Sequence, residues 1–494
     1  MTETHDHLLS RRIAAVLELS PDSPAVEFGD RWYSWRELGE PARRIRDTPA
    51  ARGRVGILLR NRPEHVAAFL GVLLAGGTVV VINPARGDDR TRTDIATMNL
   101  PLIIGAPDDT AALVTPAPGT TTLEITDPAT ASALTPASGA APTGTEPTGV
   151  AVWMLTSGTT GPPKRIDLTY DMLARSVMGL EPKPAPTAPR RWVAIVNAPL
   201  VHIGGVFRVL QCVTAARPFV FLPKFELDRW AAAVRTHRPA AVSLVPTALR
   251  MVLHSQLTKE DLRGIRVVTS GTAPLSAADA DAFQERFGIP VLTSYAATEF
   301  GGGVAGWTLP DHERFWQTKR GSVGRATGGA RLRVVDDHGT VLGADESGLL
   351  EVKPGQLGPE ADWIRTTDIA RIDADGFLWI LGRADQAIIR GGFKIMPDDV
   401  RTAIESHPAV RDAAVVARPD ERLGETPVAL VELRNTGIGA EDLAEYLSAR
   451  LARYEIPTEI AIVDTIPRTP SGKADLTAVR QHFGIGAASM ARQP

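Results

Sequence analysis

The chain of 494 residues has a single cysteine, Cys212, which excludes an internal disulfide and any multi-cysteine metal site. We expect Cys212 to be a buried free thiol, because cysteine outside disulfides is usually buried. A strong excess of one charge is also missing, since 54 basic and 57 acidic residues give a net charge of −3. This balance argues against a nucleic-acid-binding protein, which needs an electropositive face.

A long uninterrupted apolar run is missing too. The longest candidate, residues 66–82, is broken by Gly76 and Gly77 and then becomes β-branched. We interpret it as a buried helix, a glycine turn and a buried strand, not as a membrane span. The first residues, MTETHDHLLSRRIAA, show no basic segment followed by an apolar one, so no export signal is predicted. A soluble cytoplasmic protein is therefore expected.

Lysine is scarce, because only eight of the 54 basic residues are lysines and the other 46 are arginines. Where arginine supplies nearly all of the positive charge, a retained lysine is a candidate for specific chemistry. Two such lysines, Lys164 and Lys473, stand at the ends of the segments LTSGTTGPPK and PRTPSGK.

The residues that are present are typical of a globular protein, with 44% apolar and 22% charged residues. The length predicts two to four domains or subdomains. Apolar strands alternate with helices over residues 24–104 and again over 150–310, which is typical of a layered α/β fold. Residues 106–149 are rich in Ala, Thr, Pro and Gly and are predicted to be partly a surface linker, with a short strand at 121–125.

The last third of the chain changes character. Short β-rich segments between Asp-Gly and His-Gly turns fill residues 320–383 and predict a small barrel or sheet. The elements predicted after it are a helix (400–410), two strands (412–417 and 427–433) and a second helix (440–452). The predicted fold class is α/β. A large N-terminal domain over 1–384 would combine two layered α/β subdomains with a small β-barrel, and a small mobile α+β domain would follow over 385–494.

The segment LTSGTTGPPK, residues 155–164, carries the strongest local signal and follows the buried apolar run VAVWM. Its glycines, hydroxyl side chains and lysine offer backbone N–H donors and one positive charge with little steric bulk. A bound polyphosphate needs this combination. The segment is not a Walker A loop, because two prolines follow Gly161 and Arg165 follows Lys164.

This segment resembles the phosphate loop of the adenylate-forming superfamily, and the chain resembles the acyl-CoA synthetase branch of that family over nearly its whole length. The further matching motifs are PLVHIGG (199–205), VVTSGTAPLS (267–276), SYAATEFG (294–301), RTTDIARIDADGFLWILGRADQ (365–386), RGGFKIMPDDV (390–400) and PRTPSGK (467–473). The resemblance implies an enzyme that uses ATP, Mg²⁺ and CoA. A carboxylate would attack the α-phosphorus of ATP, and the CoA thiol would then displace AMP.

The resemblance also implies a role for each motif residue. The β- and γ-phosphates of ATP would be held by Thr156, Ser157, Gly158, Thr159, Thr160, Gly161 and Lys164. The rest of the nucleotide would contact Thr298 at the α-phosphate, Tyr295 with Gly271, Thr272 and Ala273 at the adenine, and Asp368 and Arg383 at the ribose. Glu299 would bind Mg²⁺. A carboxylate suits a ribose diol, because it accepts two hydrogen bonds.

Lys473 would bridge the substrate carboxylate and the α-phosphate, and His202 would gate the acyl and pantetheine tunnels. Gly391 and Gly392 would let the pantetheine arm pass close to the backbone. Each of these residues also has an ordinary structural explanation. Taken alone, an aspartate such as Asp368 is typical of a turn cap, a histidine of a satisfied buried side chain, and a lysine of a loop tip.

The second half-reaction requires Lys473 to leave the site. By the resemblance, the C-terminal domain rotates about Asp385, so residues 386–494 are expected to take two orientations.

Three positions depart from the family pattern, because Arg165, Ala296 and Thr367 replace glycines that are usual there. If those glycines serve close approach of the backbone or a positive φ, each replacement costs about 1–3 kcal/mol. An alternative function is then a ligase that adenylates poorly and transfers a ready-made acyl-adenylate, supplied by a separate partner enzyme, to CoA.

Two further alternatives stay open. One is an adenylation enzyme that loads a carrier protein, although no phosphopantetheine-bearing segment follows residue 473. The other is a nucleotide-binding protein without activity. The acid pocket is expected around residues 202–207, 269–273 and 294–303, where three consecutive glycines leave room for an elongated or bulky hydrophobic acid.

Overall fold

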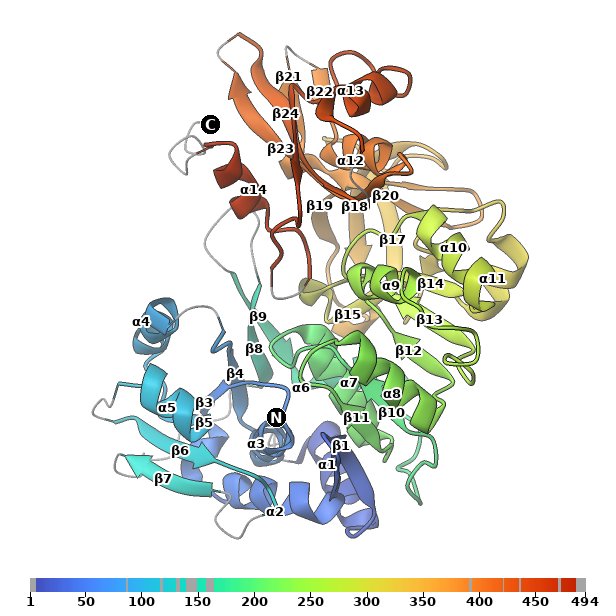
Figure 1. Cartoon of the computed structure of the whole chain (residues 1–494). Coiled ribbons are helices and arrows are strands. Elements are labelled where there is room, and N and C mark those ends of the chain that lie inside the picture. The colour runs from blue at the N-terminus through green and yellow to red at the C-terminus, as the bar shows by residue number, and fades with distance from the viewer. Residues whose placement is uncertain are drawn as a thin grey trace.

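The computed structural model describes residues 6–85, 88–115, 119–129, 134–138, 149–156, 164–390, 393–420, 422–434, 437–469 and 472–485. A large N-terminal part holds most of the chain, and a small C-terminal domain, orange to red in Figure 1, lies at the opposite end of the molecule from the blue N-terminal helices. The predicted mixed α/β fold, with a large N-terminal and a small C-terminal domain, is confirmed.

The helices are α1 Leu8–Leu19, α2 Trp35–Arg46, α3 Pro63–Ala75, α4 Asp88–Met98, α5 Pro107–Leu113, α6 Tyr170–Met178, α7 Ile203–Thr214, α8 Leu227–His237, α9 Pro246–Leu253, α10 Ala277–Phe287, α11 Leu309–Phe315, α12 Pro397–Glu405, α13 Ala440–Ser448 and α14 Leu476–His482. None of the helices in the described ranges is long and apolar enough to cross a membrane.

The first sheet contains the buried strands of the N-terminal third. Its order is β7-β6-β5-β3-β4-β8-β9, with β3 Arg54–Leu58, β4 Thr78–Ile82, β5 Leu102–Gly105, β6 Thr121–Ile125, β7 Leu134–Ser138, β8 Val150–Thr156 and β9 Lys164–Thr169. The helix, glycine turn and strand predicted over residues 66–82 are confirmed. The left-handed Gly76 (φ 76°) ends α3, and a Cβ on Gly77 would lie 1.9 Å from the Ala51 carbonyl oxygen.

Two further sheets complete the layered α/β part. One has the order β10-β11-β1-β2, with β1 Pro24–Phe28, β2 Arg31–Ser34, β10 Ala194–Val196 and β11 Phe219–Phe221. The other runs in chain order through β12 Ala241–Ser243, β13 Val267–Ser270, β14 Val291–Ala297, β15 Gly302–Gly306 and β16 Arg325–Ala326. Strands β13 and β14 are parallel, so their carboxyl ends lie side by side. The motifs VVTSGTAPLS and SYAATEFG, which extend beyond these ends, are thereby brought together.

The β-rich segment predicted over 320–383 forms an antiparallel sheet of β17 Arg331–Val335, β18 Ser347–Lys353, β19 Ile364–Ile372 and β20 Leu378–Arg383. The C-terminal sheet contains β21 Ile388–Arg390, β22 Phe393–Ile395, β23 Val410–Asp420, β24 Gly424–Leu433 and β25 Glu459–Val463, with α12 and α13 packed against it. Apolar residues of these two helices, such as Val400, Ile404, Leu443 and Leu447, form a separate core with the strands.

Three local predictions need comment. The helix expected at 400–410 covers Pro397–Glu405 and stops before Pro408, which cannot continue a helix. The sequence predicts one strand in segment 106–149, and the structure shows that the segment also contributes α5 and β7. Cys212 is a free, buried thiol as predicted, and burial raises its pKa to about 12.

Candidate active site

The phosphate-loop motif lies at the end of a β-hairpin. Strands β8 and β9 are antiparallel, and the backbones of Thr156 and Lys164 lie opposite each other. The candidate residues Ser157, Gly158, Thr159, Thr160 and Gly161 lie outside the described residues, as do Gly391 and Gly392. The hairpin therefore fixes where the chain enters and leaves the motif.

Arg165, the first departure from the family pattern, packs on the face of this hairpin. Its guanidinium carbon lies 4.2 Å from the ring centroid of Trp153. A cation–π contact at an exposed site contributes about 0.5–1 kcal/mol. Arg165 thus has a stabilising contact within the sheet.

The other two departures show no backbone strain. Ala296 and Thr367 are exposed, and neither they nor Arg165 has a positive φ. A strained, left-handed backbone conformation occurs instead at Thr272, whose φ is 72°. Because a β-branched residue rarely adopts this conformation, the predicted adenine-side loop is strained at Thr272, whereas the three positions that lost glycine are not.

This loop follows β13 and is held close to β14. A Cβ on Gly271 would lie 2.8 Å from the hydroxyl oxygen of Ser294, so only glycine fits there without a shift. Ala273 is half-buried and Thr272 is exposed.

The predicted adenine and ribose residues meet on three strands. The Tyr295 hydroxyl on β14 donates a hydrogen bond to the Asp368 carboxylate on β19, and Asp368 lies opposite Arg383 in the antiparallel pairing of β19 with β20. Burial raises the pKa of Asp368, although Tyr295 and Arg383 offset part of that rise. Burial and the nearby Asp368 carboxylate both raise the pKa of Tyr295.

Arg383 is paired with the predicted hinge residue. Its Nε and Nη2 donate to the two carboxylate oxygens of Asp385 at 2.9 and 2.6 Å. This bidentate pair raises the pKa of Arg383. To bind in this structure, a ribose would have to displace Asp385 from Arg383. It would also have to displace the Tyr295 hydroxyl from Asp368.

Thr298 and Glu299 follow β14 in a short 3-10 turn, Thr298–Phe300. Phe300 is buried and anchors this turn, while Glu299 is exposed. No group of three or more acidic, His or Cys side chains suited to a metal occurs among the residues that the structure describes. A Mg²⁺ ion at Glu299 would therefore need oxygen ligands from the nucleotide phosphates and water, which is its usual preference.

Lys473 belongs to the C-terminal domain, yet its ammonium group lies within the electrostatic field of the N-terminal site. Lys473 is exposed, but the surrounding protein partly desolvates its amine. This desolvation and the charge of Arg383 lower its pKa, whereas Asp368 and Glu299 act to raise it. Three charged groups predicted to surround the nucleotide thus lie near one lysine from a distant motif.

His202 is also close to Lys473. It precedes α7 as its N-cap residue and is half-buried. Its Nε2 is buried without a hydrogen-bond partner. Burial lowers its pKa, and the positive charge of Lys473 lowers it further. His202 is therefore neutral near pH 7 and has one ring nitrogen free for a ligand.

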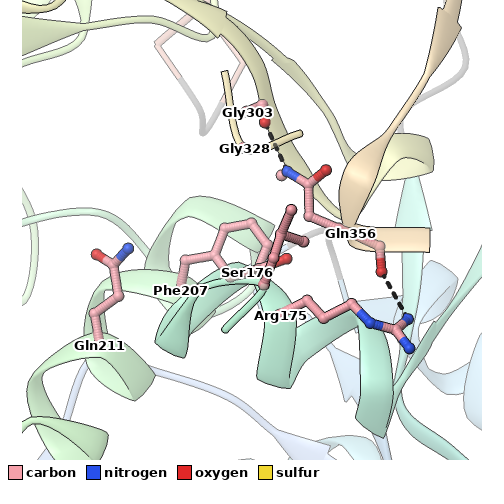
Figure 2. Close-up of a pocket in the computed structure, with 10 residues that line it drawn as sticks. Arg175, Ser176, Phe207, Gln211, Gly303, Gly328 and Gln356 are labelled. Carbon is pink, nitrogen blue, oxygen red and sulfur yellow. Dashed lines mark hydrogen bonds between the residues drawn. The ribbon is translucent and has the colours of Figure 1, made fainter. Parts of the chain in front are cut away.

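A cavity of about 240 Å³ lies between α6, α7 and β15, and neither His202 nor Lys473 is among the residues that line it. Figure 2 shows Arg175 and Ser176 of α6, Phe207 and Gln211 of α7, and Gln356 around it. Gly302 and Gly303 of β15 also line it, three residues after Glu299. Gln356 donates from Nε2 to the Gly303 carbonyl at 2.6 Å, which leaves its buried Oε1 without a partner.

The residues present fit a nucleotide and an acid. Orphaned polar atoms at His202 and Gln356, a glycine-rich wall and a lysine near two carboxylates are features of a ligand site. A model of the AMP-binding enzyme family matches residues 13–358, and a model of the AMP-binding enzyme C-terminal domain matches residues 399–473. The chain belongs to the AMP-binding enzyme family.

Curated relatives in this family include CoA ligases. The indoleacetate–CoA ligase of Aromatoleum aromaticum is 31% identical over 342 residues, which are 66% of each chain. The 2-succinylbenzoate–CoA ligase of Bacillus velezensis is 28% identical over 96% of this chain and 97% of the relative. For the 4-coumarate–CoA ligase-like 8 of Arabidopsis thaliana, 30% identical, the match spans only 61% of the relative's length.

Solved structures of family members have the same fold. The ATP-bound RpMatB-BxBclM chimera gives a TM-score of 0.80 at 26% identity, over 96% of this chain and 99% of the other. The o-succinylbenzoate CoA synthetase of Bacillus subtilis, in complex with its acyl-adenylate, gives 0.76 at 23% identity, over 95% and 97%. The fold of this AMP-binding enzyme thus matches along nearly its whole length.

A set of ion pairs joins the two domains, and the sequence motifs gave no indication of it. Arg250 on α9 bonds Asp279 at 2.8 Å and lies 3.8 Å from Glu405 and from Asp412 of the C-terminal domain. Burial acts to lower the pKa of Arg250, but its carboxylate neighbours outweigh burial and raise it. This cluster is hard to predict from the sequence, because Asp279, Glu405 and Asp412 lie far apart along the chain.

Proposed function

We propose that this protein is an acid–thiol ligase that converts a carboxylic acid to its CoA thioester through an acyl-adenylate, with ATP as the activating substrate. One observation carries the proposal. Lys473, from the C-terminal domain, lies in the field of Asp368, Glu299 and Arg383 in the N-terminal part. A retained cation beside the predicted ribose and α-phosphate residues can bring two anions together.

In the first step a carboxylate oxygen attacks the α-phosphorus of ATP and pyrophosphate leaves. Lys473 and Thr298 stabilise the charge that develops on the α-phosphate and orient the attacking carboxylate. Asp368 accepts hydrogen bonds from the ribose, and Tyr295 packs against the base. When Mg²⁺ is bound by Glu299 and the phosphates, it neutralises negative charge on the leaving pyrophosphate.

In the second step the CoA sulfur attacks the acyl carbon, the thiol proton passes to solvent, and AMP leaves with the electron pair of the broken C–O bond. Lys473 is no longer needed and obstructs this approach, so the C-terminal domain must rotate. We place the boundary after residue 384 and the hinge at Asp385, whose carboxylate is held by Arg383 in the present orientation. Rotation therefore exchanges the Asp385 pair for other partners of Arg383.

Arg250→Met should weaken the present orientation of the C-terminal domain. The side chain of Arg250 is 13% exposed, and its removal takes away the charge that links Glu405 and Asp412 to the N-terminal part, while Arg401 and Arg468 remain as their partners within the C-terminal domain. Loss of one partner of a buried pair costs about 3–5 kcal/mol, and we expect about 1–2 kcal/mol here because the cross-domain distances are 3.8 Å. Pyrophosphate release should slow about tenfold, while the thioester step from acyl-AMP should keep its rate.

Arg235→Met is the matched control, since Arg235 pairs with Asp261 on the surface of the N-terminal part at 2.8 Å. It should change neither half-reaction. Equal slowing of both half-reactions by Arg250→Met would show a general folding defect instead of a domain latch, and a thermal unfolding scan of each variant separates the two.

The alternative of a ligase that does not adenylate loses its strain argument, since no positive φ occurs at Arg165, Ala296 or Thr367. We expect Ala296→Gly to change pyrophosphate release less than about threefold. Arg165→Gly should cost about 0.5–1 kcal/mol of stability through loss of its contact with Trp153. A rise of pyrophosphate release above about tenfold in either variant would instead favour transfer of a preformed acyl-adenylate from a partner enzyme.

The tail of the acid is proposed to occupy the cavity between α6, α7 and β15. Phe207 and the glycines Gly302 and Gly303 give it an apolar, unobstructed wall, which supports the expectation of a hydrophobic body. The amide groups of Gln211 and Gln356 also line the cavity, so the acid should carry a polar group that can form hydrogen bonds with them. The names of the relatives range from indoleacetate to 2-succinylbenzoate, so the family leaves the acid open.

The direct test is turnover with a panel of acids, Mg-ATP and CoA, following pyrophosphate and thioester separately. Acid-dependent release of pyrophosphate and formation of a CoA thioester are expected. If pyrophosphate forms but CoA is not acylated, a carrier protein is the acceptor; if neither ATP nor CoA binds in calorimetry, the protein is not an enzyme of this kind.

A further inference from the structure

Arg208 is a half-buried arginine whose charge is not balanced by the protein. It lies on α7, in the stretch GGVFRVLQC, whose only other polar side chain is Gln211. Its Nη2 donates one hydrogen bond, to the Thr269 hydroxyl at 3.1 Å. Within the described part of the chain, no carboxylate forms an ion pair with it. A guanidinium has five N–H donors, and the nitrogens of Arg208 are not among the buried polar atoms that lack a partner, so its remaining donors are open to water or to a ligand.

Arg250 and Arg401, two other half-buried arginines, differ from Arg208 in having carboxylate partners, whereas Arg12 and Arg480 share its burial-lowered pKa. Arg250 faces three carboxylates, and Arg401 pairs with Asp398 and Glu405. Burial acts to lower the pKa of both, yet the carboxylates outweigh it and each pKa is raised. For Arg208 burial dominates and lowers the pKa, and the nearby Arg217 lowers it further. An unpaired charge in such a place destabilises the free protein, so its natural partner is a bound anion.

The position of Arg208 indicates which molecule brings that anion. Phe207 and Gln211, its neighbours on α7, both line the cavity proposed for the acid (Figure 2), whereas Arg208 itself lies next to this lining and not within it. Gln211 lies only about 60° from Arg208 around the helix axis. In the other direction, Thr269 stands near the end of β13, just before the loop that begins at Gly271. The guanidinium thus reaches from the cavity-lining helix to the strand that leads into the adenine-side loop.

We propose that Arg208 is a specificity-determining residue that binds a second anionic group on the acid, remote from the carboxylate that is activated. The preferred substrates are then dicarboxylic acids or similar doubly charged acids with an apolar body. This inference rests on the proposed function and names the substrate class for the same site. Arginine suits the task because its planar fork binds a carboxylate through two parallel hydrogen bonds.

The test compares straight-chain dicarboxylic acids of four to eight carbons with their mono-amides and with methyl-terminated acids of equal length. The wild type should favour the dicarboxylic member in kcat/KM. Arg208→Met should lower kcat/KM for that member by about 30-fold, as expected when one partner of a desolvated charge pair is removed. It should leave the neutral acids unchanged or improve them. Arg208→Lys should restore part of the preference.

Arg217→Met is the matched control, because it removes one positive charge from an exposed position near the same helix. It should leave the preference intact. Arg208→Met should also raise the melting temperature of the free protein, since it removes an uncompensated charge, and should abolish the thermal shift caused by the dicarboxylic acid in the presence of AMP.

Three results would overturn the inference. They are a wild-type preference for the neutral acid, an unchanged preference in Arg208→Met, and a loss of ATP affinity in Arg208→Met equal to the loss of acid affinity, which would assign the anion to the nucleotide. The binding measurement also separates this inference from the proposed function. A dicarboxylic acid that binds through Arg208 without any ATP turnover would refute the ligase and leave the anion site standing.

Discussion

Lys473→Ala is expected to slow release of pyrophosphate from acid and ATP by about 10²–10³-fold, the usual effect of removing one preorganised charge from a transition state. Transfer of a supplied acyl-adenylate to CoA should keep its rate, because that step proceeds after Lys473 has left the site. The two half-reactions are measured separately, with pyrophosphate detection for the first and thioester formation from acyl-AMP for the second.

The pH dependence of the first step gives a second readout on Lys473. Its pKa is lowered from the ordinary 10.5 by desolvation and Arg383, so the ammonium form is lost at a lower pH than in a free lysine. Adenylation should therefore fall on the alkaline side earlier than for an unperturbed lysine, and Lys473→Arg should move that fall upward. The sign for stability is opposite, because the unfolded chain holds the proton more tightly. The penalty for the charged lysine is full below its folded-state pKa and is relieved as pH rises from there toward 10.5.

Lys319→Ala is the control for these measurements. Lys319 is paired with Asp373 and Asp375 at 2.7 and 2.6 Å, in contacts that do not involve the candidate site residues. It should leave the alkaline limb unchanged. If Lys473→Ala slows both half-reactions alike, or neither, the proposed role of Lys473 is wrong.

Asp385→Pro is expected to slow the thioester step about 100-fold, an added barrier of about 2.7 kcal/mol, with a much smaller effect on adenylation. Asp385 lies within a short 3-10 turn, Ala384–Gln386, whose backbone tolerates the φ near −65° that proline imposes. The present orientation is thus preserved, whereas the backbone rotation needed to leave it is blocked. Single-turnover kinetics of each half-reaction measure the split.

Asp385→Ala separates backbone from side chain, because it removes the bidentate pair with Arg383 but leaves φ free to change. It should keep the thioester step within about fivefold of the wild type. A proline variant that forms thioester as fast as the wild type, with adenylation intact, would rule out a hinge at this residue.

The sequence alone determined the family, the mixed α/β class and the order of the main elements. Glycine, hydroxyl and lysine residues in LTSGTTGPPK are local properties of the chain, and an apolar run broken by Gly76 and Gly77 can fold in few ways. The roles that the motifs imply for Thr298, Glu299, Tyr295 and Asp368 stay predictions. The structure adds only that these residues lie close to one another. The composition of segment 106–149 predicts only one strand, whereas the described part of the segment also forms a helix and a second strand.

Only the tertiary structure decided which charges meet. Lys473 comes near Asp368 and Glu299 across more than 100 residues of chain, and Arg250 reaches Glu405 and Asp412 across a domain boundary. The same packing leaves Arg208 without a carboxylate partner, although nothing in the stretch GGVFRVLQC distinguishes it from an arginine that is paired. The physical reason is that electrostatic energy depends on distance and desolvation in the folded chain, and neither quantity is a local property of sequence.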